Sequence, residues 1–97
     1  MNNKPTSAEL ELMLKDLPGW SHENDALTKS FTFASFRDAI SFIVRVAFEA
    51  EEMDHHPEIH NVYNKLKITL RTHDAGNVVT EKDLMLAAKI ETLNTNK

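Results

Sequence analysis

One short segment in the second half of the chain limits the fold more than any other. Between residues 65 and 71, apolar side chains alternate with charged or hydroxyl-bearing ones, the apolar ones being Leu66, Ile68 and Leu70. Successive side chains of a β-strand point to opposite faces, so this segment predicts a strand with one apolar and one wet face. Such strands are typical of antiparallel sheets that are covered on one side only. We therefore expect an antiparallel sheet with its helices on a single face.

Other segments predict the remaining strands of this sheet. Residues 20–22 and 27–33 read as two strands on either side of a polar turn, and residues 59–72 divide into two strands near Asn64. Tyr63 falls within one of these strands, where its ring is expected to pack against neighbours. The sequence thus predicts four strands, arranged as two consecutive pairs.

Three helices are predicted by their capping residues. Thr6 and Glu9 have the spacing of a capping box at the start of a first amphipathic helix. Ser35 is suited to cap a long helix over residues 36–54. Thr80 is suited to cap a last helix near the end of the chain.

These elements follow the order α-β-β-α-β-β-α. The expected fold class is α+β, an antiparallel four-stranded sheet with helices packed on one face, in a single domain over residues 1–97. A chain this short buries a modest core, so oligomerisation is a natural source of further buried surface. The long helix carries a broad apolar arc, which usually covers more than one neighbour, here the sheet and another subunit. The arc consists of Phe36, Ala39, Ile40, Phe42, Ile43, Val46, Ala47, Ala50 and Met53.

Composition and charge disfavour several classes of function. The net charge of −4 argues against direct nucleic-acid binding, because phosphate binding needs a basic face. The absence of cysteine excludes disulfides, a thiol nucleophile and a thiolate metal site, and it fits the cytoplasm. No apolar segment of signal-peptide length follows the N-terminus, and Arg45 and Glu49 interrupt the apolar stretch 42–50. We expect a cytoplasmic protein that does not enter a membrane.

Three of the five histidines lie within six positions of one another. His55 and His56 are adjacent at the end of the long helix, which Pro57 terminates. Exposed carbonyl groups at a helix C-terminus favour imidazolium over imidazole, and the carboxylates of Glu51 and Asp54 act in the same direction. A histidine held in this form suits a general acid, which must hold a proton and then release it.

A metal site is an alternative use of these histidines. His56 and His60 are four residues apart, a spacing that metal-binding pairs on helices use. Pro57 lies between them and breaks the helix that would align them, so we expect no zinc or iron site there. His22 and His60 are expected to be solvated surface residues.

A wider pattern joins the histidine pair to residues far along the chain. Its spacing is Glu51-x3-His55-His56-Pro57-x5-Tyr63-x9-His73-x9-Asp83. This pattern resembles the signature of the pterin-4a-carbinolamine dehydratases, also known as dimerisation cofactors of a homeodomain transcription factor. The similarity extends over residues 10–93, and Pro18-Gly19-Trp20 falls where that family places an early tryptophan.

The resemblance implies a metal-independent hydro-lyase, a 4a-hydroxytetrahydrobiopterin dehydratase. Enzymes of this family remove water from a 4a-hydroxytetrahydropterin and give the quinonoid dihydropterin. They use no metal and no prosthetic group, so no cofactor is expected. Family members have an antiparallel sheet with helices on one side and commonly assemble as tetramers, so a homo-oligomer, either a dimer or a tetramer, is expected here.

The resemblance also implies which residues form the site. His55, His56 and His73 are expected to line the pocket and to share substrate binding with acid–base work. Glu51 and Asp54 are expected to orient and bias the imidazoles, as a carboxylate behind a catalytic histidine often does.

Three further residues are expected beside the substrate. Trp20 is a candidate wall against the flat bicyclic ring, with a core position beside the proline turn as the alternative. Arg71 and Thr72 adjoin His73 and are expected to touch the substrate, although Arg71 also fits a wet strand face. Asp83 is expected to stabilise the start of the last helix through the helix dipole rather than to act in catalysis.

An interaction protein is the alternative function. The same resemblance implies an oligomeric coactivator that binds a partner helix, with a transcription factor or a hydroxylase as the partner. The two roles are not exclusive, and catalysis ranks first because coactivation needs a particular helical partner. An interaction role should survive the loss of His55 and His56.

Overall fold

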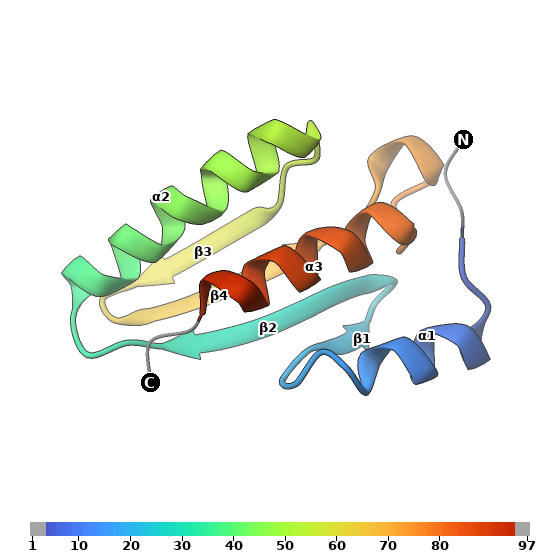
Figure 1. The fold of residues 1–97 in the computed structure, drawn as a ribbon, viewed down its shortest axis with the longest axis horizontal. Helices are drawn as coiled ribbons and strands as arrows, with labels where there is room; N and C mark the ends of the chain where they lie inside the picture. Colours follow the sequence, from blue (N-terminus) through green and yellow to red (C-terminus); the bar gives the residue numbers. More distant parts are fainter. Residues whose placement is uncertain (1–3, 95–97) are drawn as a thin grey trace.

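The computed structural model describes residues 4–94 and has the predicted order of helices and strands, with one short 3-10 helix added (Figure 1). The elements are α1 Ser7–Leu14, β1 Ser21–Glu23, β2 Ala26–Thr32, α2 Phe36–Met53, β3 Glu58–Val62, β4 Lys65–Leu70, the 3-10 helix η1 His73–Ala75, and α3 Glu81–Leu93. The predicted α+β class is confirmed.

The four strands form one antiparallel sheet in the order β1-β2-β4-β3. The strand with the alternating pattern, β4, lies inside the sheet, where Leu66 is opposite Phe31 on β2 and Asn61 on β3. Its apolar side chains Leu66, Ile68 and Leu70 are buried, whereas Lys65 and Lys67, which alternate with them, are exposed. The wet face that the sequence predicts is therefore present.

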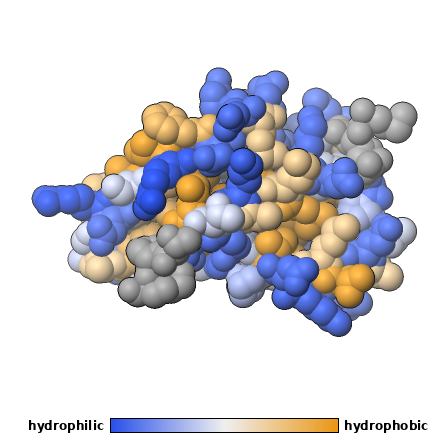
Figure 2. All heavy atoms as spheres, in the orientation of Figure 1, coloured by the Kyte–Doolittle hydropathy of each residue, from blue (hydrophilic) through white to orange (hydrophobic). Residues whose placement is uncertain are grey.

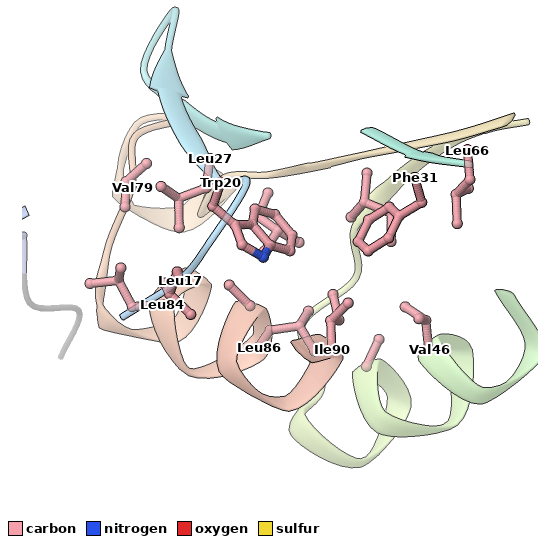
Figure 3. Packing of buried hydrophobic residues seen from close by; sticks show 14 of the residues in the cluster. Leu17, Trp20, Leu27, Phe31, Val46, Leu66, Val79, Leu84, Leu86 and Ile90 are labelled. Carbon is pink, nitrogen blue, oxygen red and sulfur yellow. The ribbon is translucent and has the colours of Figure 1, made fainter. Parts of the chain in front are cut away.

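The helices cover the opposite, apolar face of the sheet. In Figure 1, α2 and α3 run side by side over the strands, and α1 lies beside β1. The core between the layers joins Leu27 and Phe31 from β2, Val46 from α2, and Leu86 and Ile90 from α3 (Figure 3). The predicted capping box forms at the start of α1, and Ser35 and Thr80 cap α2 and α3 as predicted, Thr80 in a second capping box with Asp83.

The predicted long helix is present over nearly its whole expected length, but its apolar arc is divided between two environments. Ala39, Phe42, Val46 and Ala50 form the buried face of α2, while Phe36 is 50% exposed. No helix within residues 4–94 is both long and apolar enough to cross a membrane.

Tyr63 departs from its predicted place in a strand. It lies in the turn between β3 and β4 with a φ of 54°, and 65% of its surface is exposed. A bulky residue in this left-handed region is unusual. Tyr63 is in this conformation because it belongs to the two-residue turn between β3 and β4, where the strand prediction had extended a strand.

Candidate active site

The end of α2 places His55 by backbone geometry. Asp54 has a φ of 53° and a ψ of 44°, the left-handed conformation with which helices commonly end. The amide of Asp54 donates to the carbonyl of Glu51, and that of His55 donates to the carbonyl of Ala50 at 3.0 Å. This pair of bonds is a Schellman motif, and it turns the chain so that His55 is 92% buried, with 8% of its surface exposed.

His55 meets a fully buried carboxylate from the far end of the chain. Its Nε2 lies 2.6 Å from Oδ1 of Asp83, which is 0% exposed. The other oxygen, Oδ2, accepts the Thr72 hydroxyl at 2.8 Å and the Thr80 amide at 2.9 Å. Asp83 therefore ties the histidine loop, the end of β4 and the start of α3 together.

The hydrogen positions in this network follow from its donors and acceptors. The Thr72 hydroxyl gives its one hydrogen to Asp83, so across the 2.6 Å contact Thr80 Oγ1 is the donor and Thr72 Oγ1 the acceptor. Oδ2 then accepts two hydrogen bonds as an ionised carboxylate does, and Oδ1 accepts the Nε2 hydrogen of His55. Because Asp83 engages Nε2, Nδ1 is the nitrogen of His55 that is left for contact with a substrate.

A local motif explains how α3 supplies this carboxylate. Thr80 and Asp83 form the capping box of α3, in which the Asp83 side chain reaches back to the Thr80 amide. One oxygen is enough for that bond, so the second is free to accept from His55. The expected helix-capping role of Asp83 is present, and the contact with His55 is an addition that the sequence analysis missed.

His56 has a different environment from its neighbour. Its Nε2 lies 2.9 Å from Oε1 of Glu51, and 60% of the His56 side chain and 79% of the Glu51 side chain are exposed. The two carboxylates expected behind the imidazoles are thus divided. Glu51 contacts His56, whereas Asp54 supplies the turn and Asp83 contacts His55.

The end of β4 brings the third histidine to the same region. Thr72 is 2% exposed and belongs to the Asp83 network, and His73 follows it as the exposed first residue of η1. Arg71 Nη1 donates to Oε2 of Glu58 at 3.2 Å, and Arg71 Nε is buried without a partner among residues 4–94. The structure therefore brings His55 and Thr72 together around Asp83, with Arg71 and His73 next to Thr72 in the chain.

Trp20 lies in the core, which was the alternative placement for it. Its ring is 6% exposed and packs edge-on against Phe31, with ring centroids 6.3 Å apart (Figure 3). The indole Nε1 donates to Oε2 of Glu91 at 2.8 Å. Glu91 is eight residues along α3 from Asp83, or about 12 Å at 1.5 Å per residue. The structure thus places Trp20 in the core, and a contact with the substrate stays a prediction.

The two remaining histidines lie at the surface, as expected. His22 and His60 are exposed. Within residues 4–94, no three histidine, aspartate or glutamate side chains converge as a metal site requires.

The fold and this site define an α+β protein in which one buried and two exposed histidines gather at the end of α2 and of β4. Residues 3–93 match the model of the family described as pterin 4 alpha carbinolamine dehydratase, and the chain belongs to this family.

Named relatives and solved structures agree with this family. The chain is 51% identical over 89 residues to a protein of Opitutus terrae, covering 92% of each, and 48% identical over 95 residues to one of Paraburkholderia xenovorans, covering 96% of this chain and 98% of the other. Both carry the provisional name pterin-4-alpha-carbinolamine dehydratase. A transcriptional coactivator/pterin dehydratase from Brucella melitensis superposes with a TM-score of 0.88 at 40% identity, covering 94% of this chain and 98% of that one.

A more distant structure shows a different use of the fold. A pterin dehydratase-like protein, identified as a RuBisCO assembly factor in the alpha-carboxysome, superposes with a TM-score of 0.63 at 25% identity and covers 80% of this chain and 89% of that one.

Proposed function

We propose that this protein is a 4a-hydroxytetrahydropterin dehydratase, with 4a-hydroxytetrahydrobiopterin as the expected substrate, that works by histidine acid–base catalysis. The observation that carries the proposal is the buried His55–Asp83 pair in a chain of the pterin carbinolamine dehydratase family. Carboxylates that hold an imidazole in one tautomer and stabilise its protonated form recur in acid–base enzymes.

The reaction needs one proton delivered and one removed. The bond between C4a and the hydroxyl oxygen breaks when that oxygen receives a proton, and water leaves. The hydrogen on N5 is lost as a proton, and its electron pair forms the carbon–nitrogen double bond of the quinonoid dihydropterin. A protonated and a neutral imidazole can perform both steps, each worth about 10²–10⁴-fold in rate.

The three histidines differ in their suitability for these steps. Asp83 engages Nε2 of His55, so Nδ1 is left for contact with the substrate. His56 and His73 are exposed and can meet the substrate directly, with Glu51 to orient His56. We infer that all three contribute to the site and that Asp83 acts as a positioning residue through His55.

The direct test follows the dehydration of a 4a-hydroxytetrahydropterin by absorbance, with and without the protein. We expect wild type to exceed the spontaneous rate and the His56→Ala and His73→Ala variants to lose most of the gain while remaining folded. His22→Ala is the matched control, because His22 is exposed and lies outside the cluster. A wild-type rate equal to the spontaneous rate would contradict the proposal.

Catalysis by imidazoles alone requires no metal ion. We expect dialysis of the purified protein against a strong chelator to leave its rate of dehydration unchanged. A loss of rate that added zinc or iron restores would contradict the metal-independent chemistry. The absence of cysteine supports a location in the cytoplasm, where proteins rarely contain disulfides.

We also propose that the protein forms a homo-oligomer through α2, as a dimer or a tetramer. Four apolar residues recur every four positions on the outer surface of this helix, and Figure 2 shows apolar surface over α2. They are Phe36, Ile40, Val44 and Phe48, with exposed fractions of 50%, 37%, 47% and 72%. A contiguous apolar stripe of this kind marks an interaction surface.

The charges on α2 favour a second copy in the antiparallel direction. Arg37, Asp38 and Arg45 give the first part of the helix a net positive charge, and Glu49, Glu51 and Glu52 make the last part acidic. An antiparallel partner places each basic part beside an acidic part. The same stripe could instead receive the helix of a transcription factor or a hydroxylase, a role that the coactivator name of the Brucella protein favours.

A further inference from the structure

The outer surface of α2 is hollowed along its first half. The hollow has a volume of about 570 Å³, and its lining residues are Phe36, Arg37, Ile40, Ser41, Val44 and Arg45. Neither Arg37 nor Arg45 forms an ion pair with any residue between 4 and 94. An occupant that matches this surface therefore brings both apolar side chains and carboxylates.

Two residues of opposite charge lie at equal distances from Val44 along α2. Arg37 is seven residues before Val44, and Glu51 is seven residues after it. Seven residues make about two full turns of an α-helix, so these three side chains lie along one line of the helix surface. All three are exposed. The line thus carries a positive, an apolar and a negative side chain, in that order.

A second copy of α2 in the antiparallel direction complements this line. In a two-fold interface centred on Val44, residues at equal distances before and after Val44 face each other. The facing pairs are then Val44 with Val44, Ile40 with Phe48, Ser41 with Ala47, and Arg37 with Glu51. Apolar side chains bury one another in the middle, small side chains let the helices approach, and an ion pair closes each end.

The negative end of the line belongs to the histidine site. Oε1 of Glu51 lies 2.9 Å from Nε2 of His56, and both side chains are mostly exposed. An exposed pair of this kind loses side-chain entropy when it is held in one geometry and contributes little stability by itself. The planar guanidinium of a facing Arg37 can bind the same carboxylate through Oε2 and so hold Glu51 against His56.

We propose that Arg37 of a second copy of this chain binds Glu51 across a two-fold interface centred on Val44, so that each histidine site is completed by the other subunit. This inference rests on the proposed dehydratase function and on the α2 oligomer, and it adds a residue that one subunit supplies to the other. Arg37 is a positioning residue, because it acts on His56 through Glu51.

Disulfide cross-linking tests the contact without any assay of activity. The chain has no cysteine, so Arg37→Cys and Glu51→Cys are made singly and together and are oxidised with copper phenanthroline. Within one helix the two positions are fourteen residues apart, about 21 Å at 1.5 Å per residue, which is too far for a disulfide inside one subunit. In the antiparallel pair, the two copies of either single position are separated by a similar distance.

We expect the double variant to form a covalent dimer on a non-reducing gel and both single variants to remain uncross-linked. A covalent dimer from a single variant would indicate parallel helices. No covalent dimer from the double variant would indicate a different occupant of the hollow. Either result overturns the proposal.

Mixed oligomers test whether Arg37 acts on the other subunit. Arg37→Ala should lower the gain in dehydration rate about tenfold while sedimentation velocity still shows an oligomer, and Arg37→Lys should recover part of that gain. Arg45→Ala is the matched control, because Arg45 lines the same hollow but does not face Glu51. It should keep the wild-type rate.

Co-expression of Arg37→Ala chains with His56→Ala chains places an intact Arg37 opposite an intact histidine cluster. With random pairing, about half of the dimers are mixed and one of their two sites is complete, so we expect about a quarter of the wild-type gain. The same Arg37→Ala chains co-expressed with the double variant Arg37→Ala, His56→Ala should show no such recovery. A mixture no faster than the mean of its two components overturns the role of Arg37 across subunits. A disulfide in the double cysteine variant without dehydration by wild type leaves the contact in place and removes the dehydratase.

Discussion

Thr72 connects the histidine site to the start of α3 through one hydroxyl group. Its oxygen accepts from Thr80 and its hydrogen goes to Asp83, and all three residues are buried. Because both bonding functions of the hydroxyl are used in a place that water does not reach, a substitution there leaves polar partners without hydrogen bonds.

Thr72→Val tests this connection. Valine keeps the shape but removes the donor to Asp83 and the acceptor for Thr80, so we expect a loss of about 1–3 kcal/mol in the free energy of unfolding. Urea denaturation measures this loss. Thr69→Val is the control, since the Thr69 hydroxyl is part-buried and has only a 3.5 Å contact with Thr28. Equal effects of the two substitutions would contradict the network.

At the residue scale, the sequence predicted the histidines better than their partners. His55, His56 and His73 were predicted from the family resemblance of their spacing, and Glu51 was predicted because it is one helical turn before His55. Asp83 was found only as a cap, since its contact with His55 joins residues 28 positions apart and depends on how α3 packs. The indole N–H of Trp20 donates to Glu91 within the core, and no local sequence pattern predicts that partner.

At the scale of elements, the residues at the ends of the helices determine where the site residues lie. The predicted caps start all three helices, and one left-handed residue after α2 turns His55 inward. The sequence could predict that Pro57 stops the helix. It could not predict the left-handed turn at Asp54, because Asp is tolerated there without being required.

Substitutions at Asp54 test the turn. With a φ of 53°, the backbone strains any residue that has a Cβ, so we expect Asp54→Ala to be about 1 kcal/mol less stable than Asp54→Gly. Thermal or urea unfolding of the two variants measures the difference. Glu52→Ala against Glu52→Gly, inside the helix, should show the opposite order. An alanine variant as stable as the glycine variant at residue 54 would count against the left-handed turn.

At the scale of the whole molecule, the layered α+β architecture followed from alternation in β4 and from helix periodicity. The sequence also indicated that α2 has more apolar surface than one sheet can cover. It could not separate the buried residues of the arc from the exposed ones, because Ala39 and Ile40 are neighbours and only packing decides which turns inward.

Phe48→Asp tests the proposed oligomer. Phe48 is 72% exposed, so a charge there should leave the fold of each subunit intact but oppose burial of the α2 stripe. We expect sedimentation velocity to show wild type as a dimer or tetramer and the variant as a smaller species. Met85→Asp on α3, where Met85 is 58% exposed, is the control and should keep the wild-type size. A wild-type monomer at micromolar concentration would contradict the proposal.

The central claim is that the buried carboxylate of Asp83 prepares His55 for acid–base dehydration. The most direct measurement compares the dehydration of a 4a-hydroxytetrahydropterin by wild type and by Asp83→Asn, with circular dichroism to establish that the nearly isosteric variant is folded. We predict that wild type exceeds the spontaneous rate and that the folded variant loses about 10²–10⁴-fold of the gain. A folded Asp83→Asn protein with the full wild-type rate would contradict the claim.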